Sequence, residues 1–181
     1  MHTAARPSRP RPSSLAYVQR RALENLQFAH DTLWLLLQDV ALGDFRASHT
    51  TSHQSPEWVV THFTAHDHYC ATNLGGRAAP LHDTYRGAHP AMFDDTATVR
   101  SKAVTSLPKS AMIRHHRAAL KKLKSAASAL VPAALIQPPV GSMKGHAPDM
   151  LACIERAVWH GGWHSAPVAA IRTRHGLPPK F

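Results

Sequence analysis

The stretch that decides the fold is residues 147–181, APDMLACIERAVWHGGWHSAPVAAIRTRHGLPPKF. Apolar and small residues recur in it at alternating intervals of four and three, which is the period of one helix face. The pattern predicts a single amphipathic helix of roughly seven turns that ends at His175-Gly176, ahead of two prolines. The inward stripe of this helix consists of Met150, Ile154, Ala157, Gly161, His164, Val168 and Ile171.

Two histidines, His160 and His164, lie four residues apart at the edge of this stripe. On a helix, side chains at that spacing lie one above the other, so two imidazoles can bind one cation together. Two histidines that face a core need partners there. We therefore expect another helix to supply further polar side chains at this level.

Three more helices are expected upstream. The first spans about residues 14–42 and stops at Gly43. The second begins after Ser55, which is placed as an N-cap before Pro56, and it ends at Gly75-Gly76. The third spans about residues 111–130 and carries Met112, His116, Ala119, Leu120, Leu123 and Leu130 on its inward face.

No sustained periodicity appears in residues 77–108, between the second and third helices. So long a connection is unusual in a compact domain and in a bundle suggests a crossover, or a flap over a site. The expected fold is all-α, a single-domain four-helix bundle over residues 14–181 with a long crossover between helices 2 and 3. Residues 1–13 are rich in Arg and Pro, and we expect a disordered basic tail there, with a short transit peptide as the alternative.

The charge balance is basic, with 21 Lys and Arg against 11 Asp and Glu. Part of the excess lies along the third expected helix without interleaved aromatic residues, so we interpret it as a solvated face rather than a nucleic-acid interface. The positive balance would favour small anionic substrates. The basic residues of that helix are Arg114, Arg117, Lys121, Lys122 and Lys124.

A few features of the sequence bear on the compartment and on the oligomeric state. The two cysteines, Cys70 and Cys153, form no disulfide framework and fit a reducing, cytoplasmic compartment. They would fall at the same level if the second and fourth helices run antiparallel. No apolar run approaches the roughly 18 residues of a membrane span. Trp34, Leu35 and Leu37 lie outside the first helix's stripe and would be compatible with a homodimer.

The second helix contains another pair of histidines at a spacing of four, His62 and His66. His62 follows Trp58 by one turn and lies beside Phe63, so it should point inward, whereas His68 should point away. Facing helices of a bundle commonly build metal sites in this way. Three histidines from two helices would leave an open coordination position, which is typical of catalytic sites. With 15 histidines in the chain, ordinary packing roles are the alternative.

The order of these motifs resembles the DinB/YfiT-like family of metal-binding four-helix bundles. The first motif is Trp58-Val59-Val60-Thr61-His62 with Asp67 downstream, and the second runs from Trp159-His160 through Trp163-His164 to Ile171-Arg172, with Gly176-Leu177-Pro178 beyond. The chain departs from the family where Ala166-Pro167 replaces a usual Gly-Gln. Pro167 lacks an amide proton and should kink the helix near the site.

The resemblance implies that His62, His160 and His164 bind one divalent metal, Zn²⁺ first and Ni²⁺ or Fe²⁺ as alternatives. His66 is an alternative ligand or a catalytic proton-transfer group. In an enzyme, Asp67 or Glu155 would be carboxylates supporting a ligand histidine, and the alternative is that they are ordinary solvated charges, which we favour for Glu155. The activity it suggests is a thiol-dependent transfer or isomerisation that uses a low-molecular-weight thiol. The alternatives are a non-catalytic, stress-related metal-binding bundle and, third, a basic nucleic-acid-binding bundle.

Overall fold

A computed structural model describes residues 12–46, 55–76, 107–141 and 147–180. The described residues form four long helices and two short helical segments, and none of them forms a strand. The expected all-α bundle is therefore confirmed. The long helices are α1 (Pro12–Leu37), α3 (Pro56–Asn73), α7 (Lys109–Ala129) and α8 (Met150–Arg174), and the short ones are α2 (Leu42–Arg46) and the 3-10 segment η2 (Pro132–Ile136).

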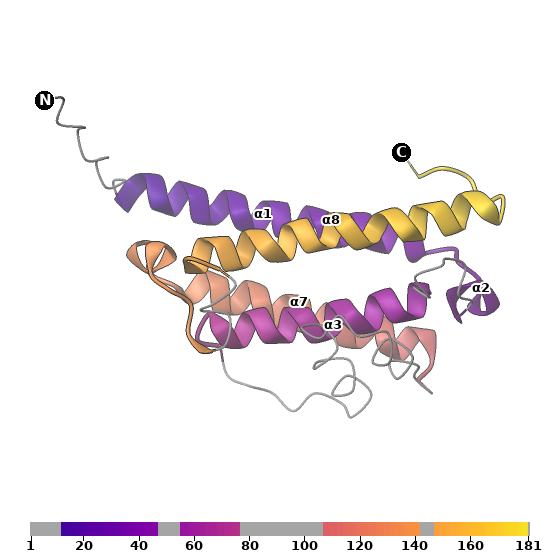
Figure 1. Ribbon diagram of the computed structural model, residues 1–181, viewed down its shortest axis with the longest axis horizontal. Helices are drawn as coiled ribbons and strands as arrows, with labels where there is room; N and C mark the ends of the chain where they lie inside the picture. Colours follow the sequence, from indigo (N-terminus) through magenta and orange to yellow (C-terminus); the bar gives the residue numbers. More distant parts are fainter. Residues whose placement is uncertain (1–11, 47–54, 77–106, 142–146, 181) are drawn as a thin grey trace, which may run out of the picture.

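The four long helices form two layers, with α1 beside α8 in one and α3 beside α7 in the other (Figure 1). Contacts between Ala29 and Gly161 and between Leu36 and Arg172 show that α1 and α8 run in the same direction. The helices α3 and α7 are also parallel to each other and run opposite to the first pair (Figure 1). A parallel pair needs a crossover connection, as expected, although residues 77–106 lie outside the described part of the chain.

The first helix ends earlier than predicted, at Leu37 rather than near Leu42, and Gly43 lies inside α2 instead of terminating α1. The end of α1 is set by contacts with residues of other helices. Lys109 of α7 donates hydrogen bonds to the carbonyls of Leu37 and Val40, which satisfies acceptors at the helix end. Phe45 of α2 is fully buried and holds the chain after this turn. Neither contact is encoded in the local periodicity of the helix.

The other helix boundaries agree closely with the prediction. The Ser55 hydroxyl accepts a hydrogen bond from the Trp58 amide, so Ser55 is the N-cap of α3. The helix α8 begins after Asp149, whose carboxylate accepts from the Ala152 amide, and is followed by Gly176 with φ 65°. The inward stripe of α8 is buried except for Met150, which is half-buried, as is Leu130 after α7.

Two surfaces that we expected to face solvent or a partner, the dimer contact on α1 and the basic face of α7, are partly covered by other residues of the chain. Leu37 is fully buried in the core and Trp34 is half-buried, so of the residues proposed for a dimer contact only Leu35 is exposed. On α7, Lys124 donates to the side chain of Gln27, and the guanidinium carbon of Arg117 lies 5.2 Å from the Trp34 ring centroid. These contacts tie part of the basic face to α1. No helix in the described ranges is both long and apolar enough to cross a bilayer.

Gly161 allows α8 to approach α1 closely, and this gives a test of the packing. A Cβ at Gly161 would lie 3.0 Å from the Ala29 Cβ and 3.7 Å from Phe63, whereas one at the neighbouring Gly162 would meet nothing within 4 Å. We expect Gly161→Leu to lower the free energy of unfolding by about 1–3 kcal/mol through overpacking. Gly162→Leu should leave it unchanged or raise it by up to about 1 kcal/mol. Urea unfolding of both variants checks this prediction. Equal free energies of unfolding would contradict the close approach of α8 to α1 at Gly161.

Candidate metal centre

The helices α3 and α8 bring His62, His160 and His164 together in the bundle interior. The Nε2 atoms of His62 and His160 lie 2.9 Å apart, and one ring nitrogen from each of the three histidines lies within 4.8 Å of the others. His62 and His164 are buried, and His160 is half-buried. The three residues that the sequence singled out as metal ligands therefore do converge on one point.

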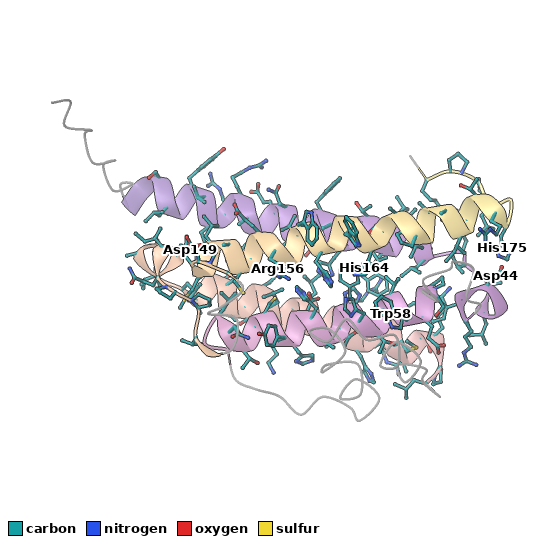
Figure 2. The ribbon with its side chains drawn as sticks, in the orientation of Figure 1. Asp44, Trp58, Asp149, Arg156, His164 and His175 are labelled. Atoms are coloured by element: carbon teal, nitrogen blue, oxygen red, sulfur yellow. The ribbon has the colours of Figure 1, made fainter. Side chains whose placement is uncertain are left out.

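Aromatic rings hold these imidazoles in place. The Trp58 ring stacks on His62 with centroids 4.5 Å apart, and it also faces His164 across the helix interface at 5.5 Å (Figure 2). Phe63 contacts His160 at 5.1 Å and His164 at 5.7 Å between ring centroids. Rings packed on several sides restrict the rotation of the histidines, which favours a fixed arrangement of donors.

Burial makes His160 and His164 neutral at physiological pH. Desolvation lowers the pKa of His164 to about 4. It also lowers the pKa of His160 far below its usual range, and the neighbouring His66, His62 and His164 act in the same direction. Neutral imidazoles keep a lone pair available, and this is the form in which histidine binds metals.

The donor set fits a divalent transition metal. Ligand atoms about 2.0–2.1 Å from a tetrahedral ion are roughly 3.3 Å apart, so the nitrogens are already near coordinating positions. The buried Nδ1 atoms of His160 and His164 have no hydrogen-bond partner among the described residues. Buried polar atoms without a partner are uncommon in proteins, so an ion that engages ring nitrogens would relieve part of an unfavourable arrangement.

His66 lies next to the three histidines without belonging to the converging set. Its ring stacks on that of His160 with centroids 4.0 Å apart, and its nitrogens are 3.7 Å from the Cys70 sulfur. This places His66 behind His160 and one turn of α3 beyond His62. The converging nitrogens are those of His62 rather than those of the alternative ligand His66.

The two cysteines are neighbours, as the antiparallel arrangement of α3 and α8 predicts. Both are buried and unoxidised. A hydrogen bond with Cys153 and burial together raise the pKa of Cys70 well above its usual range. Cys70 is therefore a protonated, unreactive thiol at neutral pH, in agreement with an inert packing role.

Asp67 does not accompany the three histidines. Its carboxylate lies on another side of α3, 3.5 Å from the Nε2 atoms of His30 and His116. His116 was expected to face inward, but His30 was missed. The spacing of the sequence does indicate that His30 faces inward, because it continues the apolar series of Leu26, Leu33 and Leu37 at intervals of four and three.

Several other residues that the sequence singled out on α8 lie away from the three histidines. Glu155 is exposed and outside the histidine group. Trp159 and Trp163 are 59% and 62% exposed, so they lie outside the core. Their rings lie against each other on the surface of α8, with centroids 5.4 Å apart. Pro167 lies inside α8, which continues to Arg174.

Comparisons of this chain with protein-family models, with curated proteins and with solved structures find no match. The likeness to DinB/YfiT-like bundles therefore remains a prediction from the two sequence motifs.

Proposed function

We propose that this chain is a DinB-like metalloprotein that binds one divalent transition metal through His62, His160 and His164 and uses it in thiol-dependent transfer or isomerisation. The observation that carries the proposal is the convergence of three imidazoles from α3 and α8. Three protein ligands leave a coordination position for a further group. Zn²⁺ suits this donor set, and Ni²⁺ and Fe²⁺ are accepted by the same ligands.

The metal, when bound, would stabilise the thiolate of a low-molecular-weight thiol at neutral pH. His62 and His164 are the buried anchors, held by Trp58 and Phe63. His160 is half-buried and therefore more accessible than the other two histidines, and we propose that a thiol and its electrophile approach from its side of the centre. We assign proton acceptance to His66, whose ring lies against His160. The net charge of +10 favours an anionic substrate.

A non-catalytic metal site is the second candidate, and two observations favour it. His62 and His164 are buried, which leaves little room for a substrate beside them. Ala166-Pro167 also lacks the polar Gln side chain that the family motif carries at this point. A closed site of this kind would hold α3 against α8 and would perform no chemistry.

The test is turnover by the metal-loaded, full-length chain on a panel of electrophiles with several low-molecular-weight thiols. We expect thiol-dependent conversion of the electrophile, by transfer or by isomerisation, to fall at least about a hundredfold in His160→Ala, because the thiolate loses its metal. His68→Ala, on the more exposed side of α3, is the control and should retain activity. Metal binding without any turnover would replace the proposal with the non-catalytic site, and full activity in His160→Ala would refute it.

A further inference from the structure

A second cluster of potential metal ligands lies between α1, α3 and α7, away from the three histidines. It consists of His30, Asp67 and His116, which are 1%, 0% and 0% exposed. One donor atom from each lies within 4.8 Å of the others, and Asp67 Oδ2 is 3.5 Å from the Nε2 atom of each histidine. Each residue comes from a different helix, so the tertiary fold creates this cluster.

The cluster has unsatisfied polar atoms on every member. Within the described part of the chain, both nitrogens of His30, both nitrogens of His116 and both oxygens of Asp67 lack hydrogen-bond partners. A separation of 3.5 Å is longer than the usual N–H···O hydrogen bond of about 2.7–3.2 Å. Leaving buried polar groups unpaired is costly, and here six such atoms belong to three neighbouring side chains. An ion that binds all three residues would account for this arrangement.

The separations suit coordination better than direct hydrogen bonding. Ligands of a tetrahedral ion at about 2.0–2.1 Å lie roughly 3.3 Å apart, close to the observed 3.5 Å. The surrounding rings are fixed, since His116 packs against Trp34 with centroids 4.8 Å apart and His30 packs edge-on against Phe63 at 5.8 Å. The donors therefore need only small movements to reach an ion between them.

The donor chemistry of the cluster fits a divalent cation. Burial raises the pKa of Asp67 to about 6, although His30 opposes this shift. Burial lowers the pKa of His30 to about 4 and that of His116 to about 3. One carboxylate and two imidazoles, placed together by three helices, are side chains that commonly bind a divalent transition metal.

The two clusters lie on different sides of α3. His62 and Asp67 are five residues apart on α3, so they point about 140° away from each other around the helix axis. Phe63 contacts histidines of both clusters, with His116 at 5.7 Å and His160 at 5.1 Å between centroids. One ion therefore cannot serve both clusters.

We propose that His30, Asp67 and His116 bind a second divalent transition-metal ion that links α1, α3 and α7. Two imidazoles and one carboxylate are a donor set for Zn²⁺ or Fe²⁺ rather than for the oxygen-preferring Ca²⁺ and Mg²⁺. The burial of all three ligands gives this site a structural role, because a substrate would have no access to the ion. This site stands independently of the proposed activity.

The experiment uses the full chain with the first centre removed, His62→Ala/His160→Ala/His164→Ala. The protein is stripped with a chelator, titrated with Zn²⁺, freed of excess ion and analysed by elemental mass spectrometry. We expect one equivalent of zinc and a rise in melting temperature on binding. Adding Asp67→Asn should remove both, whereas adding Asp31→Asn, an exposed acid on α1, should change neither.

Asp67→Asn is nearly isosteric and removes a buried charge, so the stripped protein should keep its helical circular dichroism. If this variant fails to fold, His116→Gln replaces it with the same expected loss of zinc. Absence of zinc in the triple-alanine protein would overturn the proposal, and so would zinc retained after Asp67→Asn. Because the first centre is absent throughout, failure here is distinguishable from failure of the proposed thiol chemistry.

Discussion

Replacing Arg172 by Met is expected to lower the free energy of unfolding by about 2–4 kcal/mol. Arg172 is only 2% exposed, and its guanidinium joins the C-terminal ends of α1 and α8. It donates to the Leu36 carbonyl at 2.9 Å, to both carboxylate oxygens of Asp39 and to the Pro178 carbonyl at 2.7 Å. Met fills a similar volume but cannot donate, so buried acceptors at the end of α1 would lose their partner.

The matched control is Arg174→Met, which removes the same charge from an exposed position two residues further along α8. Surface substitutions of this kind usually change stability by less than about 0.5 kcal/mol. Arg172→Lys should be intermediate, because an ammonium keeps the charge but cannot reach several acceptors as a planar fork. Urea unfolding of the three variants checks the prediction. Equal stability of Arg172→Met and Arg174→Met would show that this network does not hold the two helices together.

Much of the fold follows from local sequence signals. The 3–4 spacing of α8, the Ser55-Pro56 start of α3 and the glycines after both helices predicted their positions to within a few residues. The end of α1 was missed because it depends on Lys109 and Phe45, which act across the tertiary structure. Periodicity describes the face of a helix, but it cannot report a side chain that arrives from another helix.

The three histidines of the first centre could be found because two independent features agreed. His160 and His164 share one face of α8, and His62 lies on the core side of α3 beside Trp58. Their distances and burial required the antiparallel arrangement of the two helices, which the sequence left open. His66 and Asp67 were assigned roles by resemblance, and the structure places Asp67 with a different pair of histidines.

The second cluster was not predicted, for a physical reason. His30, Asp67 and His116 come from three helices, and no pair of them has a spacing that a short motif would reveal. Single histidines in an apolar stripe are ordinarily packing residues, so His30 gave little signal alone.

Replacing His62, His160 and His164 together by Ala is expected to remove one full equivalent of bound metal. The three side chains supply every protein ligand assigned to the first centre. Among the described residues, the other potential metal-binding cluster includes no residue of α8, so it cannot replace them. The fold should survive at neutral pH, because the aromatic walls and the cores on either side of the centre remain. The control is His68→Ala/His115→Ala, which removes histidines that lie outside both clusters.

The most direct measurement is the transition-metal content of untagged, full-length protein by elemental mass spectrometry, in the wild type, the triple-alanine variant and the control. We predict one equivalent less metal in the triple variant than in the wild type, with the control unchanged. Equal metal contents in the wild type and the triple variant, with both proteins folded, would contradict the assignment and would leave His62, His160 and His164 as packing residues of the bundle.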